Sequence, residues 1–98
     1  MFGPMTVKHS LMELSDSTPT ALPFDEGDAV NYNVSFTIQN VDTSAIVYVG
    51  GAGVSSSSYG IRLAPDAIAN FDEMPRFPGI YAISSVDNSE LAVMRFSK

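Results

Sequence analysis

NYNVSFTIQNV, residues 31–41, has the clearest pattern in the chain. Its large apolar side chains take every second position, and short polar side chains fill the positions between them; the apolar set is Tyr32, Val34, Phe36 and Ile38. Successive side chains of a β-strand point to opposite faces of the sheet. The stretch therefore predicts a strand with one face in a hydrophobic core and the other face wet or in an interface.

Shorter segments of the same kind lie on both sides of this strand, separated by turn signals. In residues 5–14, Val7, His9 and Leu11 alternate with polar residues, which predicts a half-buried strand with these three side chains on its apolar face. The segment 20–24 contains Pro23, so it is predicted to be an edge strand or a segment that crosses between sheets. Further strands are predicted at 45–49, 61–63, 80–84 and 91–96. Residues 66–72 are read as a strand in preference to one helical turn, and the last two strands as a hairpin.

These seven or eight short strands, with no amphipathic helix between them, predict an all-β fold. The spacing is typical of an antiparallel β-sandwich, and it leaves open whether the strand order is that of a jelly roll or is immunoglobulin-like. The length of 98 residues allows one domain. We expect an N-terminal arm at residues 1–4 and a single sandwich at residues 5–98.

The charge and hydropathy of the sequence argue against some classes of binding partner. The net charge of −6 argues against nucleic acid, whose phosphates require clustered Lys and Arg. Charged residues make up 16% of the chain, below the roughly 25% usual for soluble domains. We therefore expect either neighbouring chains or uncharged Ser, Thr and Asn side chains to cover much of the surface. No signal peptide is evident, and no apolar run approaches the roughly 20 residues of a membrane span. The sequence predicts a soluble protein without a membrane partner.

The stretch VYVGGAGVSSSSYGIRLAPD, residues 47–66, divides the chain into two strand-rich halves. Three glycines follow an apolar run, so it predicts a strand, a tightly turned or flexible loop, and a second strand. Bare glycine amides can bind phosphate, but a phosphate-binding loop needs a lysine and a following helix, and neither is present. A dinucleotide-binding fingerprint also fails on spacing.

Catalytic and metal-binding motifs are also missing. His9 is the only histidine and the chain has no cysteine, so His9 is interpreted as a core or interface side chain. Ser55 to Ser58 lack the Gly-x-Ser-x-Gly elbow of a hydrolase. Asp25, Glu26 and Asp28 do not match a calcium-binding loop and are interpreted as a solvated turn. We expect no catalytic residue, no metal site and no cofactor.

Aromatic residues gather in sequence around the glycine-rich stretch, at Tyr48, Tyr59, Phe77 and Tyr81. Such a group can form a sugar-stacking surface, a protein interface or a core, and the last two are the favoured interpretations. Tyr59 and Ser57 are the candidate contact residues of the loop.

Four segments together resemble a group of small structural proteins of tailed bacteriophages. They are VYVGGAGVS (47–55), YGIRLAP (59–65), GIYAIS (79–84) and LAVMRF (91–96). The common plan is a strand that ends in a glycine-rich loop, a Gly-hydrophobic-x-Leu-x-Pro return, a Tyr-Ala-Ile/Val-Ser strand and a final strand. Members of this group serve as capsid decoration proteins, head-associated proteins or fibre modules. The likeness covers about residues 31–96.

The resemblance implies a non-enzymatic β-sandwich that binds the major capsid protein and stabilises the head. The protein would be made in the host cytoplasm and would sit on the capsid exterior, commonly as a trimer. Phe2, Pro4 and Met5 are then the candidate residues for contact with the capsid or a sister subunit, because such an arm can add to a neighbour by strand pairing. The alternative is a receptor- or carbohydrate-binding module of a fibre or tail protein.

Overall fold

Eight β-strands and no helix make up the described part of the chain, residues 6–22, 34–74 and 79–97 of a computed structural model. The all-β prediction is confirmed. The strands are β1 (Thr6–Leu14), β2 (Thr20–Ala21), β3 (Val34–Asn40), β4 (Val47–Gly50), β5 (Ile61–Leu63), β6 (Ile68–Met74), β7 (Tyr81–Ser84) and β8 (Ser89–Ser97).

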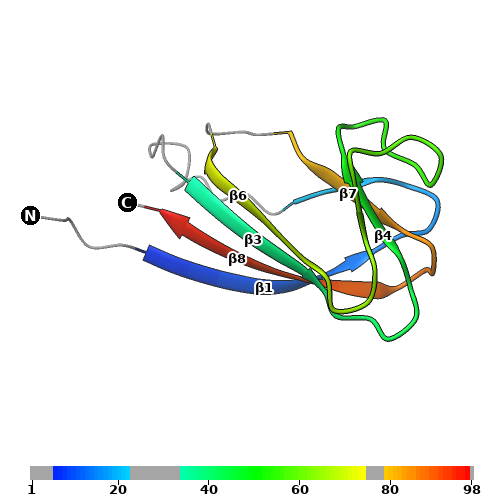
Figure 1. The fold of residues 1–98 in the computed structure, drawn as a ribbon, viewed down its shortest axis with the longest axis horizontal. Helices are drawn as coiled ribbons and strands as arrows, with labels where there is room; N and C mark the ends of the chain where they lie inside the picture. The colour runs from blue at the N-terminus through cyan, green and yellow to red at the C-terminus, as the bar shows by residue number, and fades with distance from the viewer. Residues whose placement is uncertain (1–5, 23–33, 75–78, 98) are drawn as a thin grey trace, which may run out of the picture.

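The strands form two four-stranded sheets with the orders β1-β8-β3-β6 and β2-β7-β4-β5. Figure 1 shows the long strands of the first sheet running side by side, with β7 and β4 of the second sheet beyond them. All neighbours are antiparallel. The first strand pairs with the eighth, the second with the seventh, the third with the sixth and the fourth with the fifth. This nested pairing is the strand order of a jelly roll and differs from the immunoglobulin order.

The core lies between the two sheets and is supplied by alternate residues of their strands. Phe36 and Ile38 of β3 are 1% and 0% exposed, as the alternation in residues 31–41 predicts. From the facing sheet β4 contributes Val47 and Val49, which are also fully buried. Each such side chain stabilises the fold by about 1.5–3 kcal/mol relative to an exposed position. Other members of the core cluster are Leu14, Leu22, Leu63, Ala82, Leu91 and Val93.

A buried asparagine joins the two sheets where the chain leaves β3. Asn40 is 0% exposed. Its amide nitrogen donates to the carbonyl oxygens of Ala45 (2.8 Å) and Leu63 (3.0 Å), and its Oδ1 accepts from the backbone N–H of Asp42 (3.1 Å). Because Leu63 belongs to β5, this side chain ties the end of one sheet to the other. Its polar groups are fully satisfied, as burial requires.

Asp42 completes the turn after β3. One carboxylate oxygen, Oδ2, accepts from the backbone N–H groups of Ser44 (3.0 Å) and Ala45 (2.7 Å). These two hydrogen bonds favour the ionised form and lower the pKa of Asp42 from its ordinary value. The turn is therefore held more firmly when this carboxylate is charged.

Two sequence-based predictions about the strands are wrong. β7 and β8 do not form a hairpin, because β7 pairs with β2 and β4 while β8 pairs with β1 and β3. The chain crosses between the sheets at residues 85–88. That crossing is anchored locally, since the N–H of Ser84 donates to the carbonyl of Ser15 (3.0 Å) and that of Asn88 to the carbonyl of Leu14 (2.9 Å).

The second correction concerns the faces of β1. Val7 and Leu11 are 52% and 63% exposed and His9 is exposed too, so these residues do not form the buried face of the strand. The core side of β1 carries the other alternate residues, which include Leu14 and the partly buried Met12. Register explains this, because Leu14 and Met12 lie opposite Ser89 and Leu91 on the inner side of β8. β1 has apolar residues on both phases, so alternation alone could not tell its two faces apart.

Candidate functional site

The glycine-rich loop, defined as residues 50–60, connects β4 to β5 at one end of the sandwich. It is tightly turned by its own backbone. The N–H of Val54 donates to the carbonyl of Gly51 (3.1 Å), and Ser55 and Ser58 exchange two backbone hydrogen bonds of 2.8 and 3.2 Å. The N–H of Gly60 closes the loop by donating to the carbonyl of Val49 (2.9 Å). Of the two forms that the sequence allows, the tightly turned loop is the one observed.

Gly50 has no side chain because Val54 occupies that space. A Cβ atom at Gly50 would lie 3.3 Å from Cγ2 of Val54 and 3.4 Å from the backbone nitrogen of Gly60. Val54 itself is only 5% exposed. A Cβ at Gly51, in contrast, would meet nothing within 4 Å. Of these two adjacent glycines, Gly50 is therefore the one at which an added side chain would press on its neighbours.

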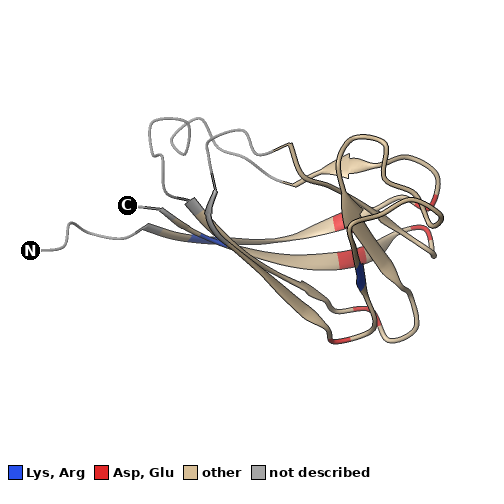
Figure 2. Cartoon of the chain, turned by 45° about the horizontal axis from the view of Figure 1, so that its top comes forward, with Lys and Arg blue, Asp and Glu red and all other residues tan. Residues whose placement is uncertain are grey.

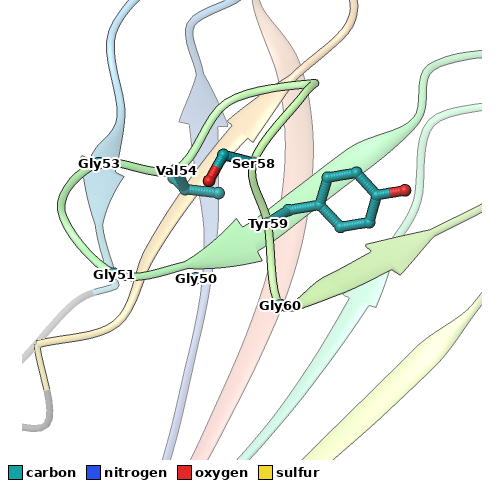
Figure 3. Close-up of a pocket in the computed structure, with 7 residues that line it drawn as sticks. All are labelled: Gly50, Gly51, Gly53, Val54, Ser58, Tyr59 and Gly60. Atoms are coloured by element: carbon teal, nitrogen blue, oxygen red, sulfur yellow. The ribbon is translucent and has the colours of Figure 1, made fainter.

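Residues of the glycine-rich loop line an open surface hollow with a volume of about 290 Å³. Its wall is mostly backbone, because four of the residues that line it are glycines; the lining is Gly50, Gly51, Gly53, Val54, Ser58, Tyr59 and Gly60. Figure 3 shows Val54 and Ser58 turned toward the middle of the loop, whereas the ring of Tyr59 points away from them. The hollow thus presents backbone groups, one hydroxyl and a neighbouring aromatic ring.

A second hollow of about 370 Å³ lies beside the first and shares Gly50, Gly51 and Gly60 with it. Apolar side chains from both sheets line it, including Ile61 and Phe71. Among the described residues that line it, this second hollow offers apolar contact and no titratable side chain.

Tyr59 packs on a second tyrosine on the outer face of the β2-β7-β4-β5 sheet. The ring centroids of Tyr48 and Tyr59 are 4.9 Å apart at an interplanar angle of 47°, a favourable tilted arrangement. Tyr81 lies on the adjacent strand β7, directly opposite Gly50. These tyrosines lie close in sequence around the loop, and the structure brings Tyr48 and Tyr59 into contact.

The two candidate contact residues of the loop are both exposed, but they are held differently. Tyr59 is 46% exposed and lines the first hollow. The hydroxyl of Ser57 lies 3.2 Å from that of Ser55, whose oxygen also accepts from the backbone N–H of Ser57 (3.3 Å). Ser57 therefore holds the tip of the loop in shape, and Tyr59 is the better placed of the two for a partner. The arm residues Phe2, Pro4 and Met5, as well as Phe77, lie outside the described residues.

The serines and the histidine that a hydrolase would need lie on different sheets. His9 is on β1, whereas Ser55 to Ser58 follow β4 of the other sheet. Residues 6–22, 34–74 and 79–97 contain no group of three His, Asp or Glu side chains placed to hold a metal ion. Asp25, Glu26 and Asp28 lie outside these ranges. Within the described ranges, then, the chain's histidine and the loop serines belong to different sheets.

Another candidate contact surface is the outer face of the β1-β8-β3-β6 sheet, called the outer sheet face below. Its exposed apolar side chains come from three strands: Val7, Leu11, Met94 and Ile68 are 52%, 63%, 39% and 56% exposed. Where side chains are described, it bears no Lys or Arg, because Lys8 and Arg95 are on the inward phase of β1 and β8. Figure 2 shows the middle of these strands free of charged residues, with acidic positions toward the end nearer the loops.

Sequence reasoning missed this face because it assigned Val7 and Leu11 to the core. The available signal was the presence of apolar residues on both phases of residues 7–14, with Met12 and Leu14 on the second phase. A strand that is apolar on both sides of a two-layer sandwich must expose one of them. The low share of charged residues in the sequence was also consistent with a surface that is covered by neighbouring chains.

Comparisons with family models, with curated proteins and with solved structures found no match for this chain. None of the described residues forms a helix long and apolar enough to cross a lipid bilayer.

Proposed function

We propose that this protein is a non-enzymatic structural component of a bacteriophage virion, of the capsid-decoration type. In this proposal it is made in the host cytoplasm, binds the major capsid protein on the exterior of the head and stabilises the lattice. On the capsid lattice it acts as a homo-oligomer, for which the resemblance to phage proteins favours a trimer. No residue has a catalytic role, and no metal or cofactor takes part.

The observation that supports this proposal is the outer sheet face. Exposed apolar side chains spread over several strands mark a contact surface in a soluble protein. Where its side chains are described, the middle of this face carries no charged residue, and the exposed carboxylates of Glu13 and Glu90 lie toward one end. A protein partner can therefore cover the middle of the face at low electrostatic cost. On a repeating lattice, contacts that are weak singly add up to stable coverage. Jelly rolls occur in capsid proteins and in lectins, so the strand order supports the proposal without deciding it.

Capsids that lack the protein provide the test, by measurement of how much purified protein they retain. Met94→Lys places a charge in the middle of the outer sheet face, and we expect about tenfold weaker binding, equivalent to roughly 1.4 kcal/mol. Val86→Lys is the matched control, because Val86 is 48% exposed against 39% for Met94 but lies in the crossing between β7 and β8. Equal loss of binding in both variants, or in neither, would contradict a role for this face.

The proposed role of the N-terminal arm needs its own test. Deletion of residues 1–5 removes Phe2, Pro4 and Met5, and we expect reduced capsid occupancy or reduced oligomer formation. Full retention of both properties would show that these residues do not make the contact.

A carbohydrate-binding module of a fibre or tail protein is the second candidate function. The Tyr48–Tyr59 pair beside the hollow of about 290 Å³ favours it, since aromatic rings next to hydrogen-bonding groups can stack on sugars. A glycan array would test this candidate with Tyr59→Ala and with Tyr59→Phe as the control that keeps the ring. Binding that survives Tyr59→Ala, or the absence of any bound glycan, would reject the sugar site at this position.

A further inference from the structure

β1 is a long strand at the edge of its sheet. It spans nine residues, Thr6–Leu14, and pairs along its whole length with β8. The sheet order gives it no second neighbour among the described strands. It has no proline and no glycine, and its register with β8 continues without a bulge. Such a regular edge is a template for another strand, and natural proteins usually interrupt edges of this kind.

Two of the four exposed outward side chains of this edge, Val7 and Leu11, are apolar, and the other two are His9 and Glu13. Leu11 is 63% exposed and Val7 is 52% exposed. Leu11 and Val7 lie opposite Ala92 and Phe96 of the neighbouring strand β8. On the outer sheet face, the apolar surface therefore continues from β8 to the free edge of β1. An added strand would continue this surface and cover part of it.

We propose that β1 pairs antiparallel with β1 of a second copy of this chain, about a two-fold axis that passes beside Leu11. The axis is perpendicular to the sheet, so the outward side chains of both copies stay on one face. The two Leu11 side chains then meet at the axis. On each side of them, His9 of one copy lies opposite Glu13 of the other, and the two sheets join into one of eight strands.

The carboxylate of Glu13 favours this pairing register over the two adjacent registers, whose axes would pass beside Ser10 and Met12. Glu13 lies directly opposite Glu90 within the chain, and both are exposed, so each carboxylate faces a like charge. Such cross-strand pairs are destabilising. An axis beside Ser10 would place Glu13 against Val7 of the second copy, and an axis beside Met12 would place it against Leu11. Only the axis beside Leu11 gives Glu13 a partner that can donate a hydrogen bond, His9.

The contact is self-complementary, which is what a two-fold interface requires. It overlaps residues 8–14 of both chains, a length of about 24 Å at 3.4 Å per residue. This pairing goes beyond the proposed function, because it is expected of the free protein and needs no capsid. It joins two copies only, so a trimer would have to use a different surface of the sandwich.

Single cysteine variants test the pairing directly, because the chain has no cysteine of its own. Opposite residues in an antiparallel pair have Cα atoms about 4.5–5.5 Å apart, within the range that a disulfide spans. We expect Leu11→Cys to form a disulfide-linked dimer under mild oxidation about tenfold faster than random collision allows. Ile68→Cys is the matched control, since Ile68 is 56% exposed on the opposite edge strand of the same face.

The proposal is overturned if Leu11→Cys is no faster than Ile68→Cys. It is also overturned if His9→Cys or Ser10→Cys gives the faster dimer, since the axis would then pass beside another residue. Sedimentation of the unmodified protein provides the second measurement. We expect a concentration-dependent mass of two chains that Leu11→Lys abolishes and Ile68→Lys preserves. A mass of three chains, or a dimer insensitive to Leu11→Lys, would refute the pairing.

Discussion

Replacement of Asn40 by aspartate changes one buried atom and gives a sharp test of how the two sheets are joined. The native amide nitrogen donates to the carbonyl oxygens of Ala45 and Leu63 at 2.8 and 3.0 Å. In Asn40→Asp a carboxylate oxygen takes its place, so two hydrogen bonds become two contacts between acceptors. The third hydrogen bond, from the N–H of Asp42 to Oδ1, is preserved.

The size of the effect follows from the two carbonyls left without a donor. Each buried polar group that loses its partner costs about 1–3 kcal/mol, so we expect the free energy of unfolding to fall by about 2–6 kcal/mol near pH 7. Asn40 is 0% exposed, so the surroundings raise the pKa of the new carboxyl group. Because the pKa is raised on folding, Asn40→Asp lowers the free energy of unfolding most when the pH is well above the unfolded-state pKa of about 3.9. As the pH falls, the carboxyl group becomes protonated in the folded protein, and the loss of stability becomes smaller.

Urea unfolding at several pH values measures this change. Gln39→Glu is the matched control, because it makes the same chemical change at the neighbouring, solvent-accessible side chain, whose amide nitrogen donates to the carbonyl of Asp66 (3.3 Å). We expect Gln39→Glu to lower the free energy of unfolding by less than about 1 kcal/mol. The reasoning is refuted if the two variants lose equal stability, or if the penalty of Asn40→Asp grows as the pH falls.

Two further predictions concern the turns. Gly50→Ala should lower the free energy of unfolding by about 1 kcal/mol, because its Cβ presses on Val54, whereas Gly51→Ala should have little effect; equal losses in urea unfolding would contradict the packing argument. Asp42 has a lowered pKa in the folded protein, so its contribution is present above the unfolded value and is lost as the pH falls through the folded one. The stability difference between the native protein and Asp42→Asn should therefore shrink on acidification, and a constant difference would contradict it.

The main architecture could be predicted because alternation and turn residues are local signals. Phe36 and Ile38 alternate with polar residues on a strand whose polar side is partly open, so their burial followed from sequence. The loop between β4 and β5 was marked by its glycines. Strand pairing was beyond reach, because the short link between β7 and β8 allows either a hairpin or a crossing between sheets. Only the packing of the whole chain decides between them.

The candidate contact surfaces were predicted less well. Leu11 looked like a core residue because apolar character does not reveal which face of an edge strand is covered. Asn40 lies near the end of the alternating stretch 31–41, and its role as a buried donor depends on Ala45 and Leu63, which come later in the chain. The contact between Tyr48 and Tyr59 was not predicted as a pair, although both residues were among the aromatic residues that lie close in sequence to the loop.

The most direct test of the proposed function is the amount and position of this protein in purified virions. Quantitative mass spectrometry combined with electron microscopy of the particles would supply both. The proposal predicts a fixed ratio to the major capsid protein and density on the outside of the head. Absence of the protein from the particle, or a few copies confined to the tail, would contradict it.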